Sequence, residues 1–343
     1  MASKKRVGRP VKNPAITDDL LRSTLDLPRK EAAAYLGLCQ RTYQARIAAL
    51  EEQPIELVNP VLSSDRSIDE ILEDRRKSFA RQARSAGSKE TIEFKIKNSK
   101  PMGLFVFGDP HLDDDGTDIA MIESHIDLIN NTPNCYAVNI GDVRNNWVGR
   151  LMALYAHQSI TESEAWELAK WFFNSVPHLL HIGGNHCTWS GGRDLLPLLA
   201  KNAGQLYVDH GARLGLTFAN KRRVSINARH KFPGNSMYNV AHGANRASRE
   251  AGILDNIVVA GHIHCSGYNI LKNPVTKLVS HCIQVASYKM FDRYAEGLGM
   301  MDRNISPSVL IVINPEAKES GLVTVYHDVE EGAAFLKFKN AKK

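Results

Sequence analysis

The sequence predicts a layered α/β protein with two β-sheets, preceded by a small all-α domain. From Thr91 onward, short apolar runs rich in Val, Ile and Leu occur among helical stretches, as expected for strands and helices packed in layers. Five apolar runs lead directly into loops that carry Asp, Asn or His, and α/β proteins gather function beyond the carboxyl ends of their strands. Before Thr91 the apolar residues follow a helical period.

The composition indicates a globular protein of two domains. The chain has 343 residues, 43% of them hydrophobic, which is enough for one large domain and a smaller one. No apolar run approaches the ~20 residues of a membrane span and no secretory signal is present, so we expect no membrane partner. The five cysteines form no C-x-x-C pair, which favours a reduced, cytoplasmic protein.

The net charge of +6 is confined to the first part of the chain. Residues 1–100 contain 20 Lys and Arg against 14 Asp and Glu, whereas the remaining residues contain 23 of each. A basic segment attached to a neutral body predicts contact with a polyanion through that segment alone. A solvated basic tail is the alternative.

Residues 1–14 are predicted to be a mobile basic arm, because they contain five basic groups and almost nothing to bury. Gly8-Arg9-Pro10 resembles the core of an AT-hook, which would place Arg9 in the minor groove of DNA. A plain basic arm is an equally good interpretation.

Residues 15–52 are predicted to form three helices. Thr17 can cap the first, Pro28 suits the first position of the second, and Gly37 can make the turn before a third helix over Gln40–Leu50. Tyr43, Ile47 and Leu50 would then face inward.

The stretch EAAAYLGLCQRTYQARIAAL resembles the helix-turn-helix of excisionase-like and small phage DNA-binding domains. The resemblance implies that the third helix enters the major groove of DNA. The DNA-binding residues would be Gln40, Arg41, Gln44 and Arg46. Cys39 departs from the usual Ser or Thr cap. A helical hairpin that mediates oligomerisation, such as a homodimer, is the alternative.

The rest of the chain divides at three boundaries. Residues 53–90 are predicted to be a linker and a connector helix, with Ser67 as the cap of the helix. Residues 91–335 form the predicted catalytic body, and residues 336–343 a basic tail. The basic residues late in the connector helix also suit a second DNA-contacting surface, and the sequence does not choose between the two.

Candidate metal ligands follow five predicted strands. The strand Leu104–Phe107 leads to Asp109 and His111, and the later ones lead to further ligands; these are Asp142, Asn185, His230, His262 and His264. Imidazoles, carboxylates and an amide oxygen together suit Mn²⁺, Fe²⁺ or Zn²⁺. Among rival histidines, His210 precedes its strand and His242 lies in a predicted helix, so the position of His230 at a strand end favours it.

In order and spacing, these motifs resemble those of the calcineurin-like metallophosphoesterase superfamily, including phage-encoded members, over roughly residues 100–290. The resemblance implies two mixed β-sheets sandwiched between helices and a centre of two divalent ions, with Mn²⁺ favoured. One ion would be held by Asp109, His111 and His264, and the second by Asn185, His230 and His262. Asp142 would bridge both ions, and His186 would act as the general acid or orient the phosphate.

General chemistry supports the same arrangement. Two ions ~3.5–4 Å apart need a shared anionic ligand and together activate water for attack on a phosphorus atom.

Two departures from the family pattern concern His186. Cys187 replaces the usual carboxylate after Gly184-Asn185-His186, and Asn145 is the residue expected to hold His186 by a hydrogen bond instead. The motif Gly141-Asp142 continues as Val-Arg-Asn-Asn and does not reach the Asp-Arg-Gly of the phosphoprotein phosphatases, so it disfavours that class of enzyme.

The sequence therefore predicts a two-metal phosphoester hydrolase, most plausibly a phosphodiesterase or nuclease that acts on DNA. The DNA inference depends on the attached basic helical segment rather than on the metal motifs. A phosphatase or small-molecule phosphodiesterase is the first alternative, and a non-catalytic DNA-binding regulator is the second. A phage-encoded protein would work in the cytoplasm of its host.

Overall fold

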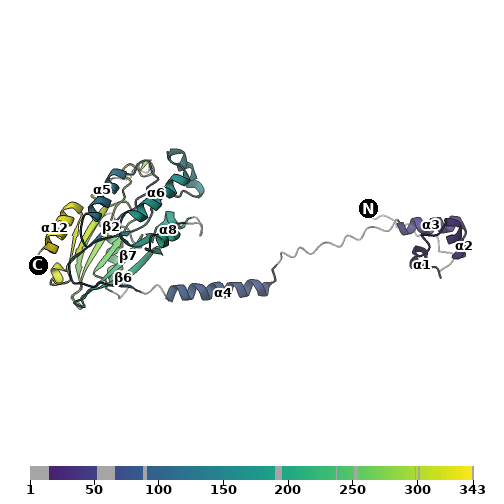
Figure 1. Cartoon of the computed structure of the whole chain (residues 1–343), viewed down its shortest axis with the longest axis horizontal. Helices are drawn as coiled ribbons and strands as arrows, with labels where there is room; N and C mark the ends of the chain where they lie inside the picture. The colour runs from purple at the N-terminus through teal and green to yellow at the C-terminus, as the bar shows by residue number, and fades with distance from the viewer. Residues whose placement is uncertain are drawn as a thin grey trace. The chain divides into compact units, whose positions relative to one another are not determined.

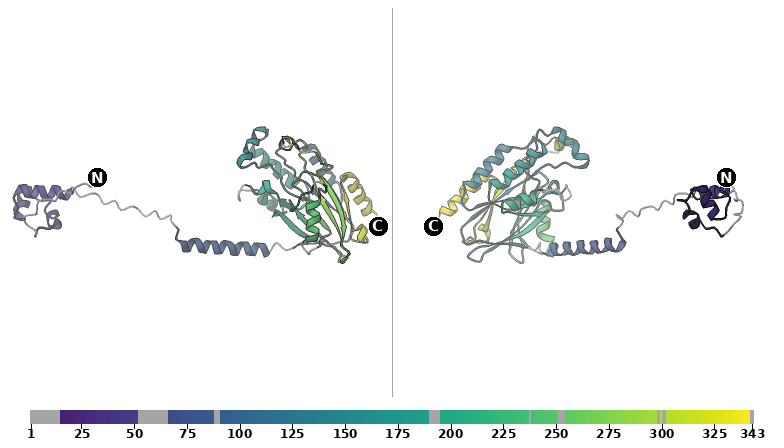
Figure 2. Two further views of the ribbon diagram at one scale, coloured as in Figure 1. Left: turned by 180° about the vertical axis from the view of Figure 1, so that it is seen from behind. Right: turned by 45° about the vertical axis from the view of Figure 1, so that its right-hand side comes forward.

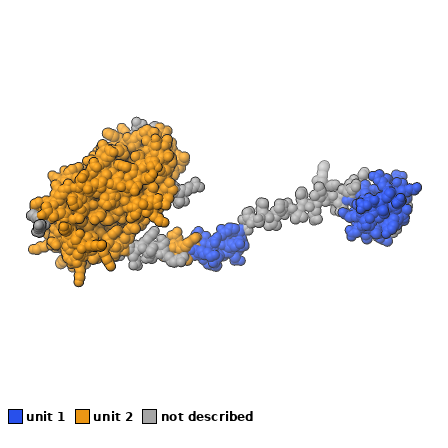
Figure 3. Space-filling view, in the orientation of Figure 1, with its two compact units in different colours: residues 1–77 blue, residues 78–343 orange. Residues whose placement is uncertain are grey.

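The computed structural model describes residues 15–51, 66–87, 91–189, 195–236, 238–250, 254–297, 299 and 302–341. Two compact units divide the chain, residues 1–77 and residues 78–343, and the division falls within helix α4, Ile68–Gly87 (Figure 3). The predicted arm with Arg9 and residues 53–65 of the predicted linker lie outside the described residues.

The N-terminal unit contains three short helices: α1 (Asp18–Arg22), α2 (Arg29–Tyr35) and α3 (Gln40–Glu51). Thr17 caps α1 by accepting a hydrogen bond from the backbone N–H of Leu20. Pro28 is the cap of α2 rather than its first residue, and Gly37 takes the positive φ of +65° that lets the chain turn toward α3. Their core consists of Leu21, Ala32, Ala33, Leu36 and Tyr43.

Helix α4 begins with the capping arrangement expected at Ser67. The backbone N–H of Ser67 donates to Glu70, and the backbone N–H of Glu70 donates to the hydroxyl of Ser67. Acidic residues occupy its first turns and Arg75, Arg76 and Lys77 follow. Its apolar residues, Ile68, Ile71, Leu72 and Phe79, are exposed.

The large unit is built on two six-stranded mixed sheets. One sheet has the order β1-β6-β7-β8-β10-β9 and the other β12-β11-β2-β3-β4-β5. The strands of the first are β1 (Thr91–Lys95), β6 (Gly211–Thr217), β7 (Arg223–Arg229), β8 (Ile257–Ala260), β10 (Val279–Gln284) and β9 (Gly267–Lys272). Those of the second are β12 (Val323–Tyr326), β11 (Ser308–Ile313), β2 (Met102–Phe107), β3 (Cys135–Asn139), β4 (His178–Gly183) and β5 (Leu206–Asp209).

The two sheets pack face to face across the main core. Strand β2 shows why: Leu104 and Val106 belong to the core shared by the sheets, whereas Phe105 and Phe107 belong to a second core on the helix side. Successive side chains of a strand point to opposite faces, so a fully apolar strand is buried on both. Strands β2, β3, β4 and β5 run parallel, as do β7 and β8, so their carboxyl ends gather at one edge of each sheet.

Helices cover the outer faces of both sheets. Helices α5 (Ile119–Asn130), α6 (Glu162–Ser175), α8 (Leu196–Asn202) and α12 (Val329–Ala341) cover one side (Figure 1). On the other side α9 (His242–Glu250) packs on β8 and β10, and the view from behind shows it in green over the strands (Figure 2). The other helices of this unit in the described residues are the 3₁₀ helix η1 (Gly149–His157), α7 (Asn185–Thr188), α10 (Arg293–Gly297) and α11 (Glu319–Leu322). Within the residues described, no helix has the length and apolarity needed to cross a membrane.

The expected architecture of two mixed sheets between helices is thus what the molecule adopts, with two differences in detail. The sequence pattern did not predict β5, β6 and β9, each of which has exposed or half-buried positions that weaken the apolar signal. The boundary of the predicted basic tail was misplaced, because residue 336 lies inside α12, where Leu336 is fully buried in the helix-side core.

Two buried histidines of β4 predict that this unit loses stability in acid. Burial lowers the pKa of His181, which stacks on Phe173, to about 3, and it also lowers the pKa of His178. An unfolded histidine has a pKa of ~6.5, so between that pH and the folded values the unfolded chain binds more protons. Stability is therefore full above about pH 6.5 and falls as the pH decreases.

At pH 5 the expected cost is about 2 kcal/mol for His181, and His178 adds to it in the same direction. Thermal unfolding of the full chain at a series of pH values measures it, and a His181→Gln variant should show a shallower fall than the wild type. Equal slopes for the two proteins would contradict the assignment.

Candidate metal centre

Seven side chains with metal-binding chemistry converge where the carboxyl ends of strands from both sheets meet. From the sheet of β2, β3 and β4 come Asp109, His111, Asp142 and Asn185; from the sheet of β7 and β8 come His230, His262 and His264. The structure therefore brings together all seven residues that the sequence predicted as ligands, although they span more than 150 positions of the chain.

The first group consists of Asp109, His111 and His264, whose potential ligand atoms all lie within 4.8 Å of one another. Asp109 is completely buried, and its Oδ2 accepts a hydrogen bond of 2.7 Å from the backbone N–H of His262. Its Oδ1 and both ring nitrogens of His111 are buried without a hydrogen-bond partner among the described residues. A divalent ion among these atoms would supply the missing partner.

The second group gathers three donor atoms around Nε2 of His230. That nitrogen lies 3.1 Å from Oδ2 of Asp142, 2.9 Å from Oδ1 of Asn185 and 3.1 Å from Nδ1 of His262. The other ring nitrogen, Nδ1, lies 3.1 Å from the backbone carbonyl of Ile140, which fixes the orientation of the ring. Two imidazoles, a carboxylate and an amide oxygen aimed at one point suit a borderline divalent ion.

Asp142 connects the two groups. Besides its place beside His230 and His262, its carboxylate lies within 4.8 Å of ligand atoms of His111 and His186. The side chain is 1% exposed, and its Oδ1 accepts a hydrogen bond of 3.0 Å from the backbone N–H of His186. This is the placement that a carboxylate shared by two ions requires.

Burial and neighbouring charges shift the pKa values of the candidate ligands in different directions. Burial lowers the pKa of His262 and of His264 to about 4 and holds that of His111 well below its ordinary value, so all three imidazoles are neutral at pH 7. Burial also acts on His230, but Asp142 and Asp109 outweigh it and raise its pKa to about 9. Burial opposes ionisation of Asp142, yet the nearby histidines lower its pKa overall.

Three glycines allow the ligand side chains to approach the backbone. A Cβ on Gly184 would lie 2.0 Å from Oδ1 of Asp142, one on Gly141 2.4 Å from Nδ1 of His230, and one on Gly261 2.7 Å from Oδ1 of Asp109. No side chain fits at such distances. The glycines of the sequence motifs are thus required by close packing against the ligands.

The backbone itself is unusual at the ligands. Four of them have a positive φ: His111 at +43°, Asp142 at +43°, His262 at +75° and His264 at +49°. Non-glycine residues avoid this region, and strain of this kind persists where the surrounding structure holds it, commonly at functional sites.

His186 lies beside the two groups, and hydrogen bonds that involve main-chain carbonyls fix its position. Its Nδ1 donates to the carbonyl oxygen of Asn145, and the side chain of Asn146 donates to the carbonyl of His186 over 2.6 Å. The sequence predicted that Asn145 holds His186 by a hydrogen bond. The bond is present, but its acceptor is the main-chain carbonyl of Asn145 and not the side chain. The Asn145 amide instead donates to Asp114 over 2.9 Å. Cys187 packs in the helix-side core.

Several neighbours of the centre were not predicted. Trp147 and Trp189 flank His186, with ring centroids 5.0 and 4.1 Å away. Asp292 places Oδ2 3.9 Å from Nδ1 of His264, and Lys289 pairs with Asp292 over 3.2 Å. These residues lie in loops without a motif, and no periodicity or spacing in the sequence marks them.

The predicted DNA-contacting residues of α3 lie in the N-terminal unit. Gln40, Arg41 and Gln44 are exposed, and Arg46 is half-buried. Tyr43 of the same helix is buried in the core of the unit.

No protein-family model matches the sequence, and a search of curated proteins also gives no match. Solved structures do align. The Pseudomonas putida nuclease MPE is 13% identical, with 65% of this chain and 86% of that one covered and a TM-score of 0.32. The calcineurin-like phosphoesterase YfkN from Bacillus subtilis is 11% identical, with coverage of 70% and 99% and a TM-score of 0.35. The Haemophilus influenzae NAD nucleotidase (NadN) is 11% identical, with 66% of this chain and 49% of that one covered and a TM-score of 0.36.

Proposed function

We propose that this chain is a calcineurin-like metallophosphoesterase that hydrolyses phosphodiester bonds with two divalent ions, and that its substrate is DNA. The observation that carries the proposal is the convergence of seven ligand side chains into two groups that share Asp142. Buried ligand atoms without partners and three glycines fitted against ligand side chains support the same interpretation.

The residues present fit such ions. Asp109, His111 and His264 would hold one, Asn185, His230 and His262 the other, and Asp142 would contact both. When bound, two divalent ions acidify water and offset the charge that builds on a phosphate during displacement. Mn²⁺ is the favoured ion, and the donor set also suits Fe²⁺ or Zn²⁺.

In this proposal His186 serves the leaving group. Because Nδ1 donates to the carbonyl of Asn145, the ring turns its Nε2 toward the centre, where it lies 3.9 Å from Oδ2 of Asp142. A protonated Nε2 can donate a hydrogen bond to a phosphate oxygen or a proton to the leaving oxygen. Asn145 acts as a positioning residue through its main chain.

DNA as the substrate is supported by the N-terminal unit. It folds around its own core and exposes Gln40, Arg41 and Gln44 on α3. Residues 1–14, which precede it, contain five basic groups and no acidic one. A small helical unit that presents polar and basic side chains from one helix suits the major groove.

The test uses the full chain with Mn²⁺ and three substrates: single-stranded DNA, double-stranded DNA and bis-p-nitrophenyl phosphate. Metal-dependent cleavage of DNA is expected. Hydrolysis of the small ester without cleavage of DNA would favour the small-molecule phosphodiesterase, and no hydrolysis of either would favour the regulator. An additional measurement addresses α3: Arg41→Ala should weaken DNA binding and reduce its salt dependence, whereas Arg22→Ala on α1 should not.

A further inference from the structure

One stretch of the large unit is strongly basic. Residues 210–249 contain eight Lys and Arg and no Asp or Glu, although residues 101–343 as a whole contain 23 of each. The stretch includes β6, β7, the loop after His230 and most of α9. A concentration of one sign of charge on a body that is neutral in sum favours binding of a polyanion at that place.

Ion pairs account for three of these eight cations, all of them on β6 or near the start of β7. The pairs are Arg213 with Asp255, Arg222 with Glu319 and Arg223 with Glu93. Three other cations, Lys231, Arg246 and Arg249, have exposed side chains. Lys231 follows the candidate ligand His230, and the two arginines lie on α9.

Helix α9 lines a pocket of about 460 Å³ with one of its faces. His242, Asn245, Arg246 and Arg249 follow the i, i+3, i+4, i+7 spacing of a single helical face, and Asn239 adds to the lining. No carboxylate is among the described residues that line this pocket. Two guanidinium groups on one face suit phosphate oxygens, which arginine binds through two parallel N–H donors.

A short loop after His230 connects this pocket to the candidate metal centre. Lys231 places Nζ 3.0 Å from Nε2 of His262, and a Cβ on Gly234 would lie 3.1 Å from Cδ2 of His242. The chain from His230 to Gly234 spans at most ~14 Å. Since a strand of DNA advances ~3.4 Å per nucleotide, a phosphate within about four nucleotides of the cleaved bond can reach the pocket.

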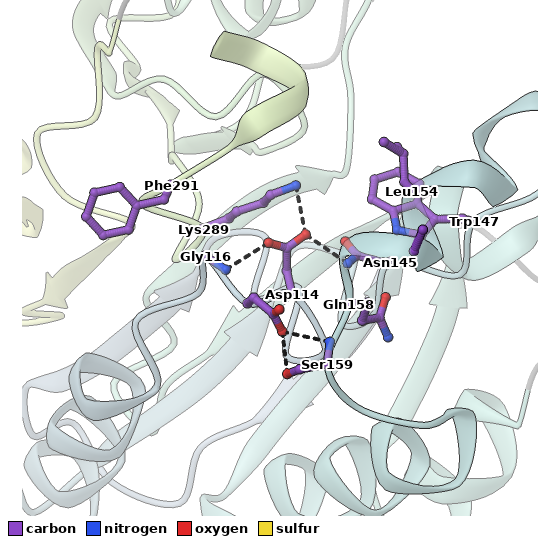
Figure 4. A pocket seen from close by; sticks show the side chains of 11 residues that line it. Asp114, Gly116, Asn145, Trp147, Leu154, Gln158, Ser159, Lys289 and Phe291 are labelled. Carbon is purple, nitrogen blue, oxygen red and sulfur yellow. Dashed lines mark hydrogen bonds and ion pairs between the residues drawn. The ribbon is translucent and has the colours of Figure 1, made fainter. Parts of the chain in front are cut away.

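A second pocket near the centre, lined by Trp147, does not suit a phosphate. Asp114 and Asp115 also line it, and Figure 4 shows Lys289 reaching Asp114, with which it pairs over 2.8 Å. Lys289 pairs with Asp292 as well, over 3.2 Å. A phosphate would meet carboxylates and a neutralised lysine there. Of the two pockets, only the one on α9 offers a phosphate the opposite charge.

We propose that Lys231, His242, Arg246 and Arg249 form a basic surface that holds the DNA strand beside the cleaved bond, with a backbone phosphate in the α9 pocket. The inference rests on the proposed function and refines it, because it gives the large unit a DNA contact of its own. Contacts to phosphates carry no sequence information, so this surface accepts any sequence. A small ester without a neighbouring phosphate gains nothing from it.

The experiment measures steady-state kinetics of the full-length protein with Mn²⁺ on single-stranded DNA and on bis-p-nitrophenyl phosphate. The double variant Arg246→Ala/Arg249→Ala is expected to lower kcat/KM on DNA about tenfold, mainly through KM, and to leave the small ester unchanged. The dependence of log kcat/KM on log salt concentration should become shallower by about 0.7 for each lost phosphate contact.

Two further variants serve as controls. Lys201→Ala/Lys337→Ala removes two exposed lysines from α8 and α12 and should behave as the wild type on both substrates. Arg246→Lys/Arg249→Lys keeps both charges and should retain most of the salt dependence on DNA. Loss of activity on both substrates in Arg246→Ala/Arg249→Ala, or a wild-type KM and salt dependence on DNA, would overturn the basic surface and leave the proposed hydrolase standing.

If the wild type cleaves neither substrate, the proposed function fails, and binding decides the basic surface. A fluorescently labelled single strand is then titrated with the full-length protein in EDTA at several salt concentrations. A shallower salt dependence of binding for Arg246→Ala/Arg249→Ala than for the lysine control supports the basic surface, and identical salt dependences overturn it.

Discussion

Replacing Asp142 by alanine is expected to abolish metal-dependent hydrolysis, with a fall in kcat/KM of at least about 10³-fold, equivalent to ~4 kcal/mol in the barrier. Asp142 is the carboxylate that lies within 4.8 Å of ligand atoms of His111 in one group and of His230 and His262 in the other. Its removal takes an anionic ligand from each and leaves His230 without the carboxylate that lies 3.1 Å from its Nε2.

Two measurements besides activity separate loss of metal from loss of fold. The Mn²⁺ content of the variant should fall, and added Mn²⁺ should raise the melting temperature of the wild type but have little effect on Asp142→Ala, because ligand binding stabilises only a protein that holds the ligand. Asp127→Ala, an exposed carboxylate on α5, should behave as the wild type. Full Mn²⁺ binding or substantial activity in Asp142→Ala would contradict the shared-ligand role.

Replacing Gly184 by alanine is expected to reduce kcat by about 10²–10³-fold without removing any ligand. The added Cβ would lie 2.0 Å from Oδ1 and 2.6 Å from Cγ of Asp142, and this carboxylate is buried and has no room to withdraw. Gly184 has an ordinary φ of −85°, so backbone strain is not part of the effect. The variant therefore tests the position of the carboxylate rather than its presence.

Gly297→Ala is the matched control, because a Cβ there meets no atom within 4 Å and the residue lies in a helix. Steady-state kinetics with bis-p-nitrophenyl phosphate and circular dichroism of both variants make the comparison. A Gly184→Ala protein with the kinetics of the wild type would show that Asp142 can shift freely, against the proposed geometry.

The apolar strands and the polar residues that follow them are what the sequence made predictable. Runs such as Leu104–Phe107 and Ile257–Ala260 are buried on both faces, and a continuous apolar pattern identifies them even in isolation. Parallel strands bring their carboxyl ends to one edge, so the proximity of Asp109 to Asp142 and of His230 to His262 follows from the strand assignment.

Other features depend on contacts that no local pattern encodes. Strands β5 and β9 are half-exposed, and α12 continues through Leu336 into a stretch whose lysines resemble a tail. The bond that orients His186 comes from the carbonyl of Asn145, and every residue has a carbonyl. The pocket lined by Asp114, Trp147 and Lys289 joins three segments of the chain that only the folded structure brings together.

The distribution of the ligands over both sheets has a consequence for folding. Asp109 and His264 belong to one candidate ligand group, yet they follow strands of different sheets and lie far apart in the sequence. Contacts of such high sequence separation form late, because closing the long intervening loop costs conformational entropy before the contact stabilises it. Under the proposed function, a partly folded chain lacks a complete ligand group, and binding of the first ion requires that the two sheets have docked.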